Sequence, residues 1–330
     1  MTQTSVIPFP FLFLTESAKI YILASVNQQV NRAPIFYATD RSATHSNRPA
    51  TYYGAERRPR NSPLEYGAYT LSDRGQLAGV HPNGSQDSFF NSIADHVRNS
   101  LSHDVLVFIH GYNTTFQEAA SRMQQLVRDL KFTGTPILYS WPSFGGVADY
   151  AFDEDSAAWS APHLRRFLQL LRKHSGAANI NLIAHSMGNR VLGMALEDLE
   201  AEKKPLFNEV IMAAPDVDKD LFEQMAQEWV GKAERITLYA SSHDYVLSAS
   251  KRFHADHDRA GESDEILVVK GVDSIDASNA SSDRSGHGYL FHSSVLADVG
   301  KLLRTDDAPN TRALRQAKSE EGPYWILART

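Results

Sequence analysis

Residues 180–189 read Ile-Asn-Leu-Ile-Ala-His-Ser-Met-Gly-Asn and carry the strongest structural signal in the chain. Their first five residues form an almost wholly apolar run, typical of a parallel strand that is covered on both faces. The next residues carry a helical stripe of apolar side chains, spaced three or four positions apart. Its members are Val191, Leu192, Ala195, Leu196 and Leu199. Between strand and helix, Ser186 lies between the small residues Ala184 and Gly188, so the pattern predicts a tight turn that carries this serine.

The alternation of short apolar runs and helical stripes continues on both sides of this segment. The predicted strands are 105–109, 136–140, 180–184, 210–213, 236–239 and 266–269. One predicted helix begins at Thr115, which can form a capping box with Glu118, and another begins near Pro162. Strands that alternate with helices indicate an α/β protein with a mostly parallel sheet and helices on both faces.

The segments outside this pattern suggest how the chain is organised. Residues 40–100 hold clusters of turn-forming and polar residues, so we expect irregular structure that covers the core. Between Pro215 and Arg235 there is room for one helix, which predicts that no large cap domain follows that strand. The predicted parts are an N-terminal extension with the first strands that partly covers the site (1–100), a catalytic core (101–305) and a C-terminal tail (306–330).

Composition excludes several classes of protein. The chain has 330 residues, 42% hydrophobic and 22% charged, which is an ordinary globular balance. Its net charge of −6 provides no positive field for nucleic acid or anionic lipid, and the absence of cysteine excludes disulfides and thiolate chemistry. The apolar stretch 6–14 contains two prolines, is too short to span a bilayer and lacks a basic start. We expect a cytoplasmic protein without a membrane span; atypical secretion and the oligomeric state stay open.

Ser186 is the predicted nucleophile. A serine hydroxyl needs a histidine to accept its proton and a carboxylate to orient that histidine. In the α/β-hydrolase order the acid follows a later strand and the histidine comes last. Asp244 and His287 stand at these two places. Asp216 also follows a strand and is the alternative acid, although it could instead cap the next helix; His292 is the alternative base.

An acyl-transfer site also needs donors for the developing oxyanion. The turn after Ser186 would supply the backbone N–H of Met187, and the loop after the strand 105–109 would supply that of Tyr112. The residues expected to line the substrate pocket are His110, Gly111, Trp141 and His185. The Gly- and aromatic-rich stretch 141–146 could form part of this wall or a flap.

A second constellation has metal-ligand chemistry. Residues 254–258 read His-Ala-Asp-His-Asp and could bind a divalent cation, but a solvated loop explains them better. The proposed acyl transfer requires no cofactor, so none is expected.

Several motifs in order resemble those of the bacterial alpha/beta hydrolases filed as domain of unknown function 900, over nearly the whole chain. They are residues 33–41 (Ala-Pro-Ile-Phe-Tyr-Ala-Thr-Asp-Arg), 110–113 (His-Gly-Tyr-Asn), 140–143 (Ser-Trp-Pro-Ser), 184–190 (Ala-His-Ser-Met-Gly-Asn-Arg), 213–216 (Ala-Ala-Pro-Asp), 238–242 (Leu-Tyr-Ala-Ser-Ser), 272–278 and 286–287. The resemblance implies an alpha/beta-hydrolase fold with esterase-type activity, in which Ser186 is the nucleophile, Asp244 the acid and His287 the base. Residues 1–32 match no motif, and their role stays open.

These observations together predict a serine hydrolase. We expect it to cleave a small carboxylic ester with a short to medium acyl group through an acyl-enzyme. An amidase, a thioesterase or a lactonase would use the same residues. A non-catalytic binding module on the same fold is the remaining alternative.

Overall fold

The structure, a computed structural model, describes residues 34–59, 62–144, 149–262, 266–280 and 285–328. Within these ranges one large sheet has the strand order β12-β13-β11-β10-β9-β8-β6-β7-β1-β4-β5, and β2 and β3 form a small separate pair. The strands are β1 (Ile35–Thr39), β2 (Arg41–Ala43), β3 (Tyr53–Arg57), β4 (Glu65–Leu71), β5 (Leu77–Pro82), β6 (Val105–Ile109), β7 (Thr135–Ser140), β8 (Ile180–His185), β9 (Phe207–Ala213), β10 (Ala233–Ala240), β11 (Asp273–Asp276), β12 (Leu314–Lys318) and β13 (Pro323–Leu327).

The middle of the sheet is parallel. β6 lies between β7 and β8, with Val107 beside Ile137 on one side and Leu182 on the other. β9, β10 and β11 continue the parallel run, whereas β4, β5 and β12 pair antiparallel with their neighbours. The carboxyl ends of the parallel strands therefore meet at one edge, where open α/β sheets bind their ligands.

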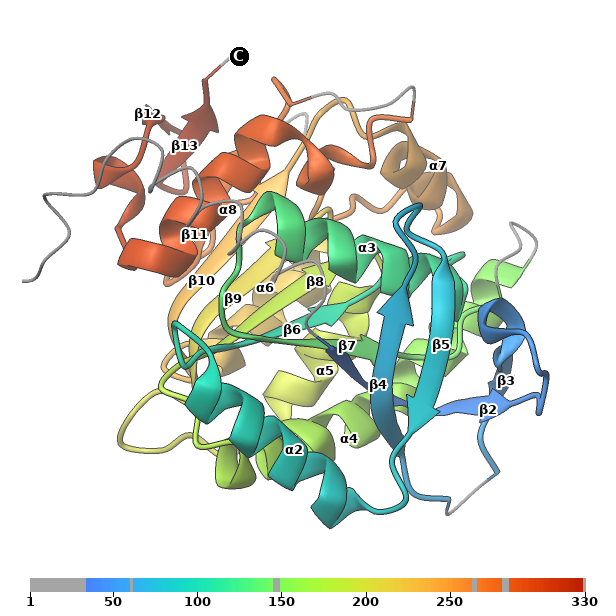
Figure 1. The fold of residues 1–330 in the computed structure, drawn as a ribbon. Coiled ribbons are helices and arrows are strands. Elements are labelled where there is room, and N and C mark those ends of the chain that lie inside the picture. The colour runs from blue at the N-terminus through green and yellow to red at the C-terminus, as the bar shows by residue number, and fades with distance from the viewer. Residues whose placement is uncertain (1–33, 60–61, 145–148, 263–265, 281–284, 329–330) are drawn as a thin grey trace, which may run out of the picture. The chain divides into compact units, whose positions relative to one another are not determined.

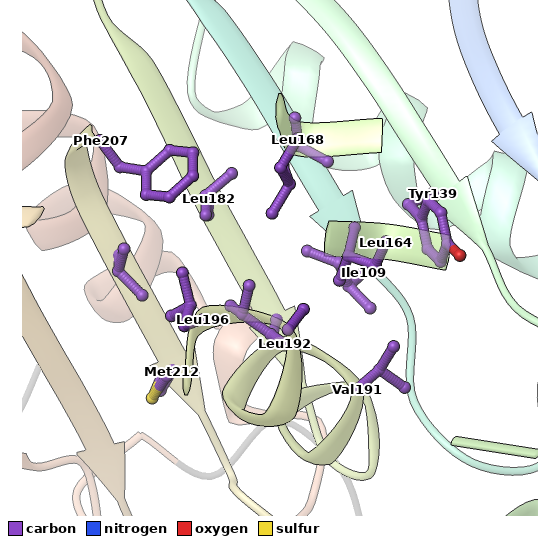
Figure 2. Close-up of a cluster of buried hydrophobic side chains, with 14 of the residues drawn as sticks. Ile109, Tyr139, Leu164, Leu168, Leu182, Val191, Leu192, Leu196, Phe207 and Met212 are labelled. Atoms are coloured by element: carbon purple, nitrogen blue, oxygen red, sulfur yellow. The ribbon is translucent and has the colours of Figure 1, made fainter. Parts of the chain in front are cut away.

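Helices cover both faces of the sheet (Figure 1). They are α2 (Gln86–Asn99), α3 (Phe116–Asp129), α4 (Tyr150–His174), α5 (Gly188–Glu197), α6 (Lys219–Trp229), α7 (Tyr245–Phe253) and α8 (Ser293–Thr305). The row α2, α4, α5 and α6 buries its apolar stripes in one continuous core against the sheet, part of which Figure 2 shows. α3 and α8 cover the opposite face, as the two-sided burial of the central strands requires. The chain thus has the alpha/beta-hydrolase fold.

Most of the predicted elements are present. The first five predicted strands lie within β6 to β10, and Thr115 caps α3 through a complete capping box. α6 is the single helix between Pro215 and Arg235, so that segment has no room for a large cap domain. In the part of the chain that the structure describes, no helix is long and apolar enough to cross a membrane.

The prediction of a strand at 266–269 was wrong. The strand that pairs with β10 is β11, which begins at Asp273, and its other edge is occupied by β13. Both edges of β10 and of β11 are therefore paired, and 266–269 buries Leu267 and Val269 outside the sheet. Apolar runs of this length signal burial, and only the pairing partners decide whether they are strands.

Two further expectations need correction. α4 begins at Tyr150, so Pro162 lies well inside the helix and not in its first turn. The residues ahead of this proline already bury side chains, and the packing of a long helix outweighs the one hydrogen bond that a proline removes. The segment 40–100, expected to be irregular, contains β4 and β5, which extend the main sheet, and α2. In β4 and β5 the buried residues Tyr66, Tyr69 and Leu77 are separated by glycine, alanine and exposed polar residues such as Thr70 and His81, which obscured the strand pattern.

Candidate active site

Ser186 lies in a strained turn between β8 and α5. Its φ of 53° is in the left-handed region, which non-glycine residues seldom adopt, and its side chain is almost wholly buried. The surrounding backbone holds this conformation: the N–H of Ser186 donates to the carbonyl of Ala213 (3.0 Å), and the carbonyl of Ser186 accepts from the N–H and the side-chain amide of Asn189 (3.0 Å each). A side chain on Gly188 would collide with the carbonyl oxygens of Ile109 and His110. This is the tight strand-turn-helix geometry that the sequence predicts for a nucleophile.

His287 and Asp244 are direct partners. The Nδ1 of His287 lies 2.7 Å from Oδ2 of Asp244, whose side chain is fully buried. Asp244 follows β10 and caps α7, because its Oδ1 accepts from the N–H groups of Val246 (3.1 Å) and Leu247 (3.0 Å). Gly286 has φ 68° and lies so close to the loop of Asp244 that a side chain there would collide with the carbonyl of residue 243. The glycine therefore lets the histidine loop lie directly on the acid's loop.

His185 brings His287 to the serine turn. The rings of the two histidines are 4.8 Å apart, and Nε2 of His185 lies 3.1 Å from the carbonyl oxygen of His287, to which it can only donate. Burial lowers the pKa of His185 to about 3, helped by the positive charge that His287 can carry. His185 is therefore neutral at physiological pH and ties the backbone of His287 to the residue that precedes Ser186.

Asp216, the alternative acid, is held in a different network. Its Oδ1 accepts from Ser250 Oγ (2.7 Å) and from Nε of the buried Arg259 (2.9 Å), and its Oδ2 accepts from the hydroxyl of Tyr150 (2.8 Å). These contacts involve no histidine. His292, the alternative base, is the N-cap of α8, where its ring accepts from the N–H of Ser294 (3.3 Å).

The two loops expected to hold the oxyanion meet at Ser186. A Cβ added to Gly111 would lie 2.8 Å from the Cβ of Ser186, so the backbone of the 110–113 loop approaches the serine as closely as a glycine permits. Met187 is the N-cap of α5. The N–H groups at the start of a helix have no acceptor within the helix, and they form its positive end. The ring of Tyr112 packs on that of Tyr150, 5.2 Å away.

Two residues predicted for the pocket wall lie in the core instead. Trp141 has no exposed surface, its ring stacks on His110 (5.2 Å, 8° between planes), and its indole N–H donates to the carbonyl of His110 (2.7 Å). His110 is equally buried, and burial together with the nearby Arg41 lowers its pKa to about 3. Both residues support the loop that carries Gly111: the indole of Trp141 donates to the carbonyl of His110, and Nδ1 of His110 lies 2.8 Å from the carbonyl oxygen of Gly111. Residues 145–146 of the predicted flap lie outside the described residues.

The His254–Asp258 segment makes contacts with its neighbours. Nε2 of His254 lies 3.2 Å from a carboxylate oxygen of Glu154, and Asp258 pairs with Lys251 at 2.5 Å. Among the residues that the structure describes, no cluster of three or more metal-ligating side chains is found. The Lys251–Asp258 contact is that of a partly exposed ion pair.

Sequence reasoning missed several buried polar residues that support the site. Asn189 holds the carbonyl of Ser186, and Arg41 and Asp153 hold the loops that follow β6 and β7. No local pattern distinguishes Arg41 and Asp153 from surface residues, because their side-chain partners lie 9 to 102 positions away in the chain. Only their presence among the quoted motifs, for Arg41 and Asn189, marked them at all.

A comparison with protein families agrees with this fold. Residues 85–304 match the family described as alpha/beta hydrolase of unknown function (DUF900). An uncharacterised protein of Nostoc sp. (strain PCC 7120) is 25% identical over 230 residues, which are 55% of this chain and 58% of that protein, so the match spans under two thirds of the relative's length. The crystal structure of an uncharacterised protein from Capnocytophaga ochracea is similar with a TM-score of 0.35 and 10% identity, over 72% of this chain and 59% of that chain. This structural likeness is too weak to carry an argument.

Proposed function

Since this chain belongs to the DUF900 family of alpha/beta hydrolases, we propose that it is a serine hydrolase that cleaves carboxylic esters with short to medium acyl groups. The observation that carries the proposal is the contact between His287 and Asp244 (2.7 Å), with His287 also held against His185, the residue that precedes Ser186 in its turn of φ 53°. A buried carboxylate on Nδ1 favours the tautomer whose Nε2 can accept a proton from a serine hydroxyl.

The proposed reaction has two steps. Ser186 Oγ attacks the ester carbonyl while His287 takes its proton, and the alcohol leaves with that proton as the acyl-enzyme forms. Water then attacks the acyl carbonyl while His287 takes its proton, and the bond to Ser186 Oγ breaks as Oγ regains that proton and the carboxylic acid is released. Asp244 orients His287 throughout, and the N–H groups of Tyr112 and Met187 donate to the oxyanion in both steps. A small ester is the expected substrate class, because α6 is the single helix between β9 and β10 and that segment inserts no large cap domain.

Ser186→Ala tests the proposal. The variant should lose about four or more orders of magnitude in kcat on p-nitrophenyl acetate, because only binding and the oxyanion donors remain. Labelling by a fluorophosphonate should be rapid in the natural protein and absent in the variant. Turnover that survives the substitution would refute the assignment of Ser186.

A substrate panel tests the finer claim. Parallel rates on p-nitrophenyl esters of two to sixteen acyl carbons, and on amide, thioester and lactone analogues, should be highest for the shorter esters. Rates that rise steadily with acyl-chain length would contradict the proposed preference for short to medium acyl groups. A preference for another bond type would replace the esterase assignment.

A further inference from the structure

We propose that Arg41 is a positioning residue for the oxyanion hole: it fixes the loop that carries Tyr112 and so aims that N–H at the reacting carbonyl. The inference rests on the proposed function. Arg41 begins β2 and lies outside residues 85–304, the segment that matches the family. The N-terminal part of the chain would thus contribute to the catalytic apparatus.

The buried guanidinium of Arg41 joins the loops that follow β6 and β7 to the end of β7 and to β3. Its side chain is almost wholly inaccessible, and its Nε donates to Ser140 Oγ (2.9 Å). Nη1 donates to the carbonyls of Gly54 (3.0 Å) and Ser143 (3.1 Å), and Nη2 donates to that of Thr114 (2.6 Å). All of these acceptors are neutral oxygens. The planar fork of donors, more than the charge, therefore determines what the side chain does here.

Asp153 of α4 also binds the loops that follow β6 and β7. Its Oδ2 accepts from Ser143 Oγ (2.5 Å) and from the N–H of Asn113 (3.4 Å), and its Oδ1 accepts from the N–H of Phe144 (2.9 Å). Ser143 Oγ in turn accepts from the N–H of Thr114 (3.1 Å). The two residues that follow Tyr112 are thus held by hydrogen bonds: Asn113 through its N–H, and Thr114 through its N–H and its carbonyl.

The loop needs this support because its backbone is strained. Asn113 has φ 52°, a left-handed conformation that persists only where the surroundings impose it. On the near side, Gly111 lies against Ser186 with no spare room. Tyr112 is held between these two constraints, so a shift at Thr114 moves the N–H of Tyr112 relative to Ser186. A misplacement of about 1 Å in a catalytic group can cost roughly 100-fold in rate.

Arg41→Lys is the decisive variant. Lysine keeps the charge but presents a compact ammonium that cannot reach all the acceptors of the fork. We expect kcat on a p-nitrophenyl ester to fall about 10- to 100-fold with KM changed less than about threefold, since the oxyanion donor acts in the transition state. The matched control is Arg312→Lys. Arg312 is another buried arginine, and its Nη1 lies 3.5 Å from Oδ2 of Asp298 in α8.

A thionoester separates positioning from general damage to the fold. Sulfur accepts hydrogen bonds weakly, so the preference for the ester over its thiono analogue reports on the oxyanion donors. In Arg41→Lys the ratio of the two kcat values should fall about tenfold, and in Arg312→Lys it should stay at the wild-type value. Ser143→Ala removes the hydroxyl between Thr114 and Asp153 at little cost in volume, should lower the ratio in the same way, and decides the matter if Arg41→Lys does not fold.

The outcomes separate this inference from the proposed function. If the wild-type protein shows no turnover that depends on Ser186, the proposed function is refuted, and this inference with it. If the wild type is active and the folded Arg41 or Ser143 variants keep its thionoester ratio, this inference alone is wrong.

Discussion

Asp244→Asn should inactivate the protein while leaving it folded. In the wild type, Oδ1 of Asp244 accepts from the N–H groups of Val246 and Leu247, and Oδ2 faces Nδ1 of His287 at 2.7 Å. Asparagine can keep its Oδ1 on the two N–H groups, because the cap of α7 requires only an acceptor. Its amide nitrogen then donates one N–H to Nδ1, which must accept. The imidazole is thereby forced into the tautomer with the proton on Nε2, where it cannot take the proton of Ser186.

The size of the effect follows from this geometry. A change of this type in a Ser-His-Asp site costs about 10⁴ in kcat, which is about 5.4 kcal/mol of transition-state stabilisation. The free energy of unfolding should change by less than about 2 kcal/mol, since the cap and the packing are kept. The rates are measured on p-nitrophenyl acetate, and stability by urea denaturation of the same samples.

Asp216→Asn is the matched comparison. It removes the charge that pairs with the buried Arg259 and should cost about 3–5 kcal/mol of stability, with a smaller loss of kcat than at Asp244. The reasoning is refuted if Asp244→Asn keeps more than a tenth of the wild-type kcat, or if Asp216→Asn loses more.

Two further substitutions test the site loop and a buried acid. Gly111→Ala should abolish activity because its methyl would lie 2.8 Å from the Cβ of Ser186, whereas Gly84→Ala, with open space around it, should be neutral; equal rates in the two variants would contradict the close approach. Burial, aided by Asp306, raises the pKa of Glu209 to about 10 from an ordinary value of 4.5. The folded protein therefore keeps a proton that the unfolded chain releases, so stability falls as pH rises from 4.5 towards 10, by up to about 1.4 kcal/mol per pH unit. Glu209→Gln should remove this loss, and urea denaturation at pH 5 and pH 8 should show a larger gain over wild type at pH 8; an equal gain at both would argue against a buried neutral acid.

The sequence by itself determined the features that depend on local pattern. The period of the apolar residues predicts β6 to β10 and the helices between them, because each strand of a parallel sheet must be buried on both faces. Small residues on either side of Ser186 predict the sharp turn, since bulky ones would collide with the loop after β6. The chain order of serine, aspartate and histidine names Ser186, Asp244 and His287 as candidates before any distance is known.

Only the tertiary structure decided which buried groups meet. The sequence suggests Trp141 as a pocket residue, but its buried indole stacks on the ring of His110. The run 266–269 reads as a strand, but β11 pairs with β10 in its place and β13 pairs with the other edge of β11. Arg41 has no local signature, because its hydrogen bonds across about a hundred residues depend on how the whole sheet is assembled. The partners of Asp153 lie 9 to 40 residues away, on loops that the fold brings to α4. Local pattern fixes which faces are buried, whereas long-range packing fixes the partners that each buried polar group finds there.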